Sequence, residues 1–214
     1  MNLPAIVRHI DSIDYQTCWQ EMRDFTDQRD DETPDQLWLL EHPSVFTLGQ
    51  AGKPEHILNA GEIPVVKTDR GGQVTWHGPG QTVIYLLLDI RRAGIGPREL
   101  VTRMENAVIN YLGSLGLTAE TRAGAPGVYV NHSKIASLGL RIRQGRSYHG
   151  LSLNREPDMS VFSRINPCGY EGQPVTSLAQ LGLDPDRQSC ENGLLKTLKE
   201  QFGFHYRSNQ HSTS

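Results

Sequence analysis

The spacing of hydrophobic residues predicts three amphipathic helices along the chain. They cover residues 11–25, 98–112 and 187–202, where apolar side chains recur at helical spacing. The first helix is expected to start at Asp11 or Ser12, because a short polar side chain accepts a hydrogen bond from the unpaired amides of a helix start. Its apolar face consists of Tyr15, Cys18, Trp19, Met22 and Phe25.

The segments between these helices contain patterns that are typical of β-strands. Strands are expected at residues 36–42, 44–50, 63–69, 73–77 and 82–90. Residues 138–153 predict a hairpin, with its turn near Gln144 and Gly145. Strands in the middle of the chain with helices around them favour an α+β fold, in which helices flank a mixed, largely antiparallel sheet. We expect a single domain at residues 1–206 and a disordered tail at 207–214.

The composition agrees with one globular domain of this kind. The chain has 214 residues, of which 37% are hydrophobic and 21% are charged, and its net charge is -3. This charge argues against binding to nucleic acid or to an anionic membrane. The longest apolar run, VIYLLL, is strand-sized, whereas a bilayer helix needs about 20 residues. The N-terminus lacks the pattern of a signal peptide, so we expect a cytoplasmic protein.

The three cysteines differ in their sequence surroundings. Cys18 and Cys190 lie on the apolar faces of predicted helices, which explains them as core residues. Cys168 lies between Pro167, which restricts the backbone, and Gly169, which frees the next turn. Such a corner can project a thiol, although a buried structural cysteine is the alternative. With an odd number of cysteines, no C-x-x-C and scattered histidines, we expect neither a disulfide framework nor a metal site.

The stretch RGGQVTWHGPGQ, residues 70–81, has the features of a pocket wall. Paired glycines let the backbone pass close to a ligand and expose amide groups that can bind an oxyanion. Alternation along the following strand would place Gln73, Thr75 and His77 on one face. A tight turn with a β-bulge is the structural alternative.

Two further stretches, KIASLGLR and HGLSLN, lie on the two arms of the predicted hairpin. The first begins with Lys134, for which a solvated surface charge is the ordinary interpretation. In the second, Gly150 and Ser152 leave a gap in one strand face that suits a bulge or a slender ligand. If the hairpin forms a pocket wall, a side chain added at Gly139 or Gly150 is expected to intrude on the ligand.

In this order, RGGQVTWHGPGQ, KIASLGLR, HGLSLN and NPCG resemble the signature segments of the lipoyl(octanoyl) transferase family, also called lipoate-protein ligase B. The resemblance covers nearly the whole chain and implies the fold of biotin and lipoate protein ligases. It implies transfer of an octanoyl group from the phosphopantetheine of acyl carrier protein to a lysine of lipoyl domains, the first step of endogenous protein lipoylation. The implied acceptors are 2-oxoacid dehydrogenase E2 subunits and the glycine cleavage H protein, with no ATP or metal required.

The resemblance also implies roles for individual residues. The family's nucleophilic cysteine, which carries the acyl group as a thioester, falls on Cys168, and its partner lysine falls on Lys134. Ser152 stands where the family frequently has alanine, and a serine fits the same space. The implied substrate-binding residues are Arg70, Gly71, Gly72, Gln73, Val74, Thr75, Trp76, His77, Ser137, Leu138, Gly139, Gly150, Leu151 and Ser152.

Three other functions remain open at this point. An ATP-dependent lipoate or biotin ligase of the same fold would carry a similar lysine and glycine-rich loop, but it needs no nucleophile such as Cys168. A cysteine hydrolase could pair Cys168 with His77 or His149. A non-catalytic acyl-binding or carrier-binding module would keep the pocket and tolerate the loss of the thiol.

Arginines gather in the hairpin and in a second stretch of the chain. They could form a docking face for acidic partner proteins, and solvated side chains are the simpler alternative. The residues concerned are Arg91, Arg92, Arg98, Arg141, Arg143 and Arg146.

Overall fold

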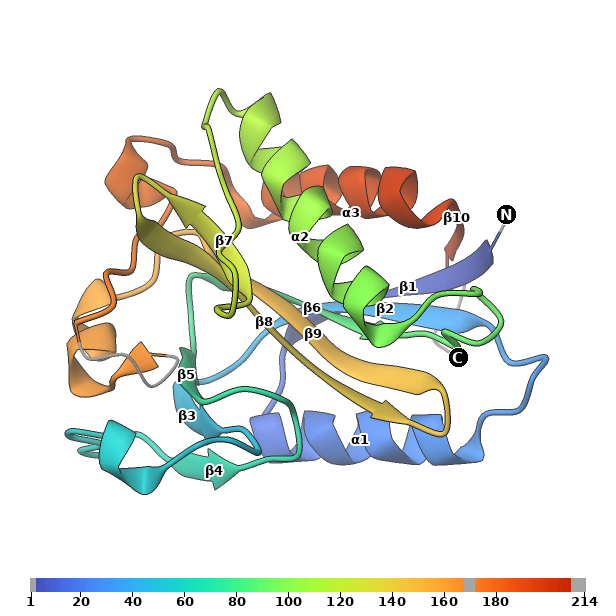
Figure 1. Cartoon of the computed structure of the whole chain (residues 1–214), viewed down its shortest axis with the longest axis horizontal. Coiled ribbons are helices and arrows are strands. Elements are labelled where there is room, and N and C mark those ends of the chain that lie inside the picture. The colour runs from blue at the N-terminus through green and yellow to red at the C-terminus, as the bar shows by residue number, and fades with distance from the viewer. Residues whose placement is uncertain (1–2, 168–171, 209–214) are drawn as a thin grey trace.

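The computed structural model describes residues 3–167 and 172–208, so Cys168 lies outside the described residues. Within these ranges the main sheet has seven strands, in the order β10-β1-β2-β6-β9-β8-β7 (Figure 1). It is parallel from β10 to β2 and antiparallel from β2 to β7. The strands are β10 (Phe204–Ser208), β1 (Leu3–Ser12), β2 (Asp35–Glu41), β6 (Gln81–Leu87), β9 (Arg146–Asn154), β8 (Ser133–Arg143) and β7 (Gly127–Val130).

A small second sheet lies beside the main one. It has the order β4-β3-β5 and contains β4 (Val65–Lys67), β3 (Val45–Leu48) and β5 (Val74–His77). One face packs on the 3₁₀ helix at Met159–Arg164, where Trp76 meets Phe162 with ring centroids 5.7 Å apart. This sheet carries the glycine-rich stretch, because residues 68–73 connect β4 to β5.

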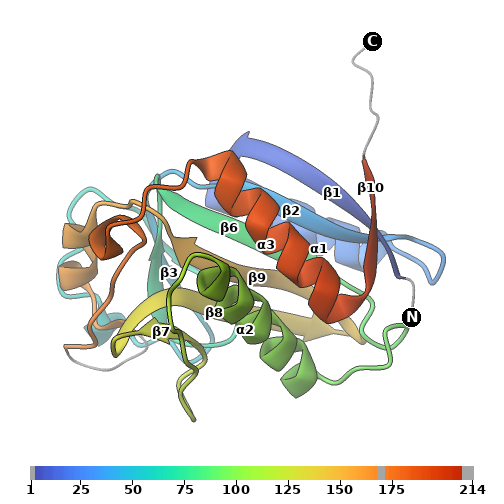
Figure 2. The same cartoon turned by 90° about the horizontal axis from the view of Figure 1, so that it is seen from above.

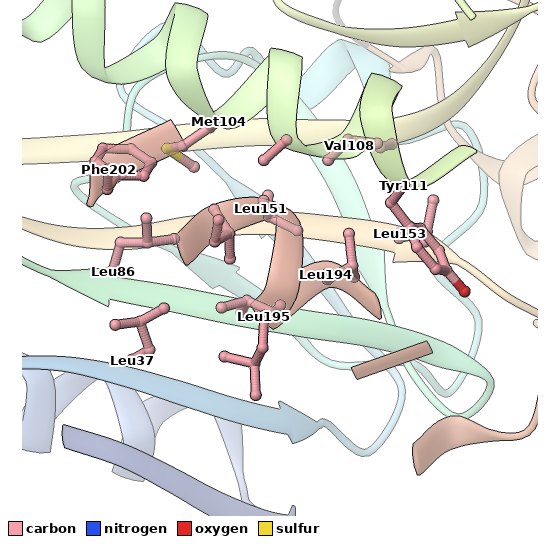
Figure 3. Close-up of a cluster of buried hydrophobic side chains, with 14 of the residues drawn as sticks. Leu37, Leu86, Met104, Val108, Tyr111, Leu151, Leu153, Leu194, Leu195 and Phe202 are labelled. Carbon is pink, nitrogen blue, oxygen red and sulfur yellow. The ribbon is translucent and has the colours of Figure 1, made fainter. Parts of the chain in front are cut away.

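Three helices cover the two faces of the main sheet. Helices α2 (Pro97–Ser114) and α3 (Arg187–Phe202) pack on one face, and α1 (Tyr15–Gln28) packs on the other (Figures 1 and 2). The larger core lies under α2 and α3, because apolar residues of these helices meet every second residue of the strands. Figure 3 shows this core, with Leu37, Leu86, Leu151 and Leu153 from strands and Met104, Val108, Tyr111, Leu194, Leu195 and Phe202 from helices.

Most of the predicted elements are confirmed, and the start of the first helix is wrong. Asp11 and Ser12 belong to β1, where Ser12 pairs with β2. The helix cap is Asp14, whose Oδ1 accepts a 3.0 Å hydrogen bond from the amide of Thr17. The sequence pattern favoured the wrong cap because three polar residues of similar capping propensity precede Tyr15.

The predicted hairpin is formed by β8 and β9 with its turn at Gln144 and Gly145, whose φ values are 51° and 74°. Positive φ at both central residues is typical of the type I′ turn that suits two-residue hairpins. The chain continues in β10 up to Ser208, so the tail expected to be disordered from residue 207 begins with two strand residues. Residues 209–214 lie outside the described part of the chain.

The α+β fold class predicted from the sequence is confirmed. Strands β1 and β10 were not predicted, since their pairing joins the two ends of the chain. In the described ranges, no helix is long and apolar enough to span a membrane.

Candidate functional site

A cavity of about 380 Å³ lies between the β8–β9 hairpin and the glycine-rich stretch. Its floor consists of small residues that face each other across the two strands, Ser137 opposite Ser152 and Gly139 opposite Gly150. Missing side chains on neighbouring strands leave a trough above a sheet, since side chains normally fill that layer. The fold therefore creates space at the positions where the sequence has its smallest residues.

The glycine-rich stretch is held over this trough by backbone and side-chain bonds. The amide of Gly71 donates to the carbonyl of Leu140 at 2.8 Å, which fastens the stretch to β8. The buried Arg70 guanidinium donates to the carbonyl oxygens of Thr47 (2.7 Å) and Gln73 (2.8 Å). Arg70 thus links β3 to the glycine-rich stretch and holds the upper wall of the cavity in place.

Asp69, directly before Arg70, ties the same wall to two other elements. Its carboxylate accepts hydrogen bonds from Trp19 Nε1 of α1 (2.9 Å), from His149 Nε2 (3.0 Å) and from the Tyr148 hydroxyl. Partial burial opposes ionisation, but the bonds from His149, Tyr148 and Trp19 lower the pKa of Asp69 to about 2. Sequence reasoning missed Asp69, because its partners come from distant parts of the chain.

His149 has an unusual backbone conformation that makes this contact possible. Its φ is 61°, in the left-handed region that non-glycine residues rarely adopt. Regular alternation would point Tyr148 and His149 to opposite faces of β9. The positive φ interrupts that alternation, so both side chains reach Asp69. Burial lowers the pKa of His149, with the nearby Asp69 carboxylate acting in the opposite direction.

Lys134 lies at the end of the cavity that residues 124–126 close, and only 3% of its surface is exposed. Its Nζ donates to the carbonyl of Pro126 at 2.9 Å and lies 5.6 Å from the Tyr129 ring centroid. Its stem passes Gly127, where an added Cβ would lie 2.4 Å from Cε. The interpretation of Lys134 as a solvated surface charge is therefore wrong.

The backbone of Lys134 pairs with the segment that follows Cys168 in the sequence. The Lys134 amide donates to the carbonyl of Pro174 at 2.8 Å, and the Thr176 amide donates to the carbonyl of Lys134 at 2.9 Å. This parallel bridge places residues 174–176 beside the start of β8. Cys168 itself, the predicted nucleophile, lies outside the described residues.

The other two cysteines are enclosed in the core, as predicted. Cys18 and Cys190 are free thiols with no exposed surface. Burial raises the pKa of Cys18 to about 12 and also raises the pKa of Cys190. Neither thiol is suited to nucleophilic chemistry near neutral pH, because the thiolate is the reactive form.

Thirteen of the fourteen predicted substrate-binding residues line the cavity, and Trp76 does not. Trp76 turns to the opposite face of β5 and packs in the core beside Phe162. Eight further lining residues were not among the predicted substrate-binding residues; Leu140 and His149 lie within the motifs KIASLGLR and HGLSLN, and the other six come from stretches outside the motifs. The eight residues are Tyr15, Tyr85, Val101, Gly124, Ala125, Pro126, Leu140 and His149.

The expectation for Gly150 needs correction. A Cβ at Gly150 would lie 2.0 Å from the carbonyl oxygen of Ile84 and would meet the backbone of β6 instead of projecting into the cavity. A Cβ at Gly139 would lie 3.2 Å from Arg70 Cδ and 3.3 Å from the carbonyl of Gly71, at the cavity wall. Gly139 therefore limits the cavity, whereas Gly150 permits a close approach of two strands.

Most of the candidate docking arginines are engaged in ion pairs with aspartates. Arg92 Nη2 lies 2.7 Å from the buried Asp35, and Arg143 Nη1 lies 3.0 Å from Asp27. Arg91 and Arg146 both form ion pairs with Asp31 and Asp89. This pairing within the protein neutralises much of the charge of these four arginines.

Comparison with known proteins identifies the family. A model described as the lipoyl protein ligase A/B catalytic domain matches residues 14–199. The chain belongs to this family. An octanoyltransferase of Alcanivorax borkumensis is 58% identical over 201 residues, covering 94% of this chain and 82% of the relative. An octanoyltransferase of Aromatoleum aromaticum is 56% identical over 194 residues, covering 91% and 84%.

Solved structures of the family and of biotin ligases share the fold. Lipoate-protein ligase A bound with ATP has a TM-score of 0.80 at 14% identity, covering 98% of this chain and 89% of the other. Biotin protein ligase from Aquifex aeolicus has a TM-score of 0.55 at 12% identity, covering 95% and 70%. The predicted ligase-like fold and the prediction of an acyltransferase of this family are confirmed. The family model covers ligases A and B alike, whereas the relatives at 56–58% identity are named octanoyltransferases and not ATP-dependent ligases.

Proposed function

We propose that this member of the lipoyl protein ligase A/B family transfers an octanoyl group from acyl carrier protein to a lysine of lipoyl domains. The observation that carries the proposal is the buried Lys134 at one end of a trough floored by glycine and serine. The names of the relatives above support octanoyl as the transferred group. The acceptors would be E2 subunits of 2-oxoacid dehydrogenases and the glycine cleavage H protein.

The trough suits a slender acyl chain. Its floor has only small residues at Ser137, Gly139 and Ser152, and Leu138, Leu140 and Leu151 add apolar surface at its edges. Burial of the six methylene groups of an octanoyl chain contributes on the order of 5 kcal/mol at about 0.8 kcal/mol each. The same burial keeps water away from a thioester and so protects it from hydrolysis.

In the first step, the Cys168 thiolate attacks the octanoyl thioester of the carrier. A bond from the cysteine sulfur to the acyl carbon forms, and the bond from that carbon to the pantetheine sulfur breaks. A cationic Lys134 favours the thiolate by opposite charge and then gives its proton to the departing sulfur. Support for this pairing is that residues 174–176, shortly after Cys168, bond to the Lys134 backbone.

In the second step, the neutral amine of the acceptor lysine attacks the Cys168 thioester. The carbon–nitrogen bond forms, the carbon–sulfur bond breaks, and the amine proton passes to the neutral Lys134. This restores the thiolate and the ammonium group. Because an amide is more stable than a thioester, the transfer proceeds without ATP, and no metal has a role in either step.

We place the reaction in the cytoplasm, where Cys18 and Cys190 would stay reduced. The deciding experiment is intact-protein mass spectrometry after incubation with octanoyl-carrier protein in the absence of ATP. The expected result is a mass increase of one octanoyl group that maps to Cys168 and disappears when a lipoyl domain is added. An octanoyl group on another residue, or transfer that requires ATP, would refute the proposal.

A further inference from the structure

His77 is fixed in one orientation by a chain of three hydrogen bonds. Its Nδ1 lies 2.7 Å from Gln81 Oε1, Gln81 Nε2 donates to Asn154 Oδ1 at 2.9 Å, and Asn154 Nδ2 donates to the carbonyl of Thr176 at 3.0 Å. The three side chains are almost fully buried. These hydrogen bonds run from β5 in the small second sheet, across β6 and β9, to the segment that pairs with Lys134.

Two backbone carbonyls determine how every group in this chain is oriented. The Thr176 carbonyl oxygen can only accept, so the Asn154 amide nitrogen must face it and Asn154 Oδ1 must face Gln81. The carbonyl of Trp76 likewise accepts from Gln81 Nε2 at 3.3 Å, which leaves Gln81 Oε1 for His77. Since Oε1 is an acceptor, the proton of His77 resides on Nδ1.

The other ring nitrogen, Nε2, is therefore a lone-pair acceptor. His77 lines the cavity, and within the described residues Nε2 makes no hydrogen bond and is not enclosed by protein. Burial, with additional effects of His42 and Arg70, lowers the pKa of His77 well below its usual value. The ring stays neutral at pH 7 and accepts a hydrogen bond without taking the proton.

An octanoyl chain offers no donor to such an acceptor, and neither does its thioester carbonyl. Covering Nε2 with alkyl groups alone would leave a buried acceptor unpaired, which is unfavourable. The proposed reaction brings two N–H groups close to the thioester: the cysteamine amide of the donor's pantetheine arm and the amine of the acceptor lysine. Either group can supply the missing hydrogen bond.

We propose that His77 Nε2 accepts a hydrogen bond from an N–H group of a protein substrate's arm, and that Gln81 and Asn154 are the positioning residues that keep this nitrogen unprotonated. The inference rests on the proposed function. For the acceptor amine, such a bond would hold one N–H so that the nitrogen lone pair faces the thioester carbon while Lys134 receives the departing proton.

Two substitutions of His77 separate its two nitrogens. In His77→Asn, the side-chain amide can still donate to Gln81 in place of Nδ1, but nothing replaces Nε2. In His77→Gln, the longer side chain places an acceptor near the position of Nε2, but the bond to Gln81 is lost. Single-turnover rates are measured for both variants in the two half-reactions: thiol release from octanoyl-carrier protein, and transfer from isolated acyl-enzyme to a lipoyl domain.

We expect His77→Asn to slow one half-reaction by roughly 5- to 150-fold, the usual cost of an unpaired substrate group, and His77→Gln to restore most of that rate. Loss in thiol release identifies the pantetheine amide as the donor, and loss in transfer identifies the acceptor amine. A greater loss in His77→Gln than in His77→Asn, an equal loss in both half-reactions, or no loss at all would overturn the inference.

Nitrogen NMR of the imidazole rings tests the positioning role without any substrate. In the parent protein at pH 7, His77 is expected as the Nδ1–H tautomer, and in Gln81→Met this preference should disappear. An Nε2–H tautomer in the parent would overturn the inference and leave the proposed function intact. Absence of acyl-enzyme in the parent would refute the proposed function, and this inference with it.

Discussion

Gly139 and Gly150 face each other across the β8–β9 hairpin, and an alanine should have opposite consequences at the two positions. In Gly150→Ala, the new methyl group would lie 2.0 Å from the carbonyl oxygen of Ile84 and 3.0 Å from Cα of Tyr85. Both contacts are to the backbone of β6, so no side-chain rotation relieves them. Strands β6 and β9 must separate where Tyr85 pairs with Gly150, in the middle of the main sheet.

The expected loss of stability in Gly150→Ala follows from the backbone atoms that the new methyl group would meet. Overpacking in a well-packed interior costs about 1–3 kcal/mol, and a contact with two backbone atoms in a central strand pair belongs at the upper end. A loss of about 3 kcal/mol lowers the melting temperature of a chain of this size by roughly 6–12 °C. In Gly139→Ala the closest contacts, 3.2 Å to Arg70 Cδ and 3.3 Å to the Gly71 carbonyl, need shifts of a few tenths of an ångström.

We therefore expect Gly139→Ala to melt within a few degrees of the parent and to alter acyl selection, because its methyl group narrows the trough. Thermal unfolding followed by circular dichroism measures the first effect. Competition between octanoyl- and hexanoyl-carrier protein measures the second, with the octanoyl preference reduced in Gly139→Ala. The reasoning is refuted if Gly150→Ala keeps the parent melting temperature, or if Gly139→Ala slows both acyl groups equally.

Further predictions concern Lys134, its neighbour, the core thiols and a buried histidine. Lys134→Ala and Lys134→Arg should each lower octanoyl transfer by roughly 10²–10⁴-fold, because arginine does not release its proton; a near-parent rate in Lys134→Arg would reduce the lysine to an electrostatic neighbour. In Gly127→Ala, the added Cβ would lie 2.4 Å from Lys134 Cε at a φ of 141°. This variant should reproduce much of the loss of octanoyl transfer when equal amounts of folded enzyme are compared. Cys18 and Cys190 should resist iodoacetamide at pH 8 in the folded protein and react after unfolding, as peptide mapping would reveal, since burial raises the pKa of both thiols. Burial lowers the pKa of His42 to about 4, so between pH 6.5 and 4 the folded state binds fewer protons than the unfolded state. The free energy of unfolding should therefore fall by about 3 kcal/mol as the pH is lowered from 6.5 to 4. Urea titrations at several pH values measure this slope, and an identical slope in His42→Gln would contradict the assignment.

Local patterns in the sequence were sufficient for most elements of the fold, but not for strands β1 and β10, which pair across the two ends of the chain. The helical spacing of Leu100, Met104 and Val108 predicted α2, because one apolar stripe must be buried whatever covers it. The turn at Gln144 and Gly145 was equally local, since a two-residue hairpin requires positive φ within the dipeptide itself. The segments that line the trough were also recognisable, because small residues and paired glycines mark places where a backbone or a ligand comes close.

Roles that depend on partners distant in the chain were decided by the tertiary structure alone. Asp69 became an anchor only because Trp19 and His149 converge on it, and Gly150 proved to be a contact between strands only when β6 was placed beside it. Lys134 is buried because residues 124–127 fold over its side chain. Sequence periodicity reports which face of an element is buried, whereas what buries it depends on long-range packing that no short window of the chain contains.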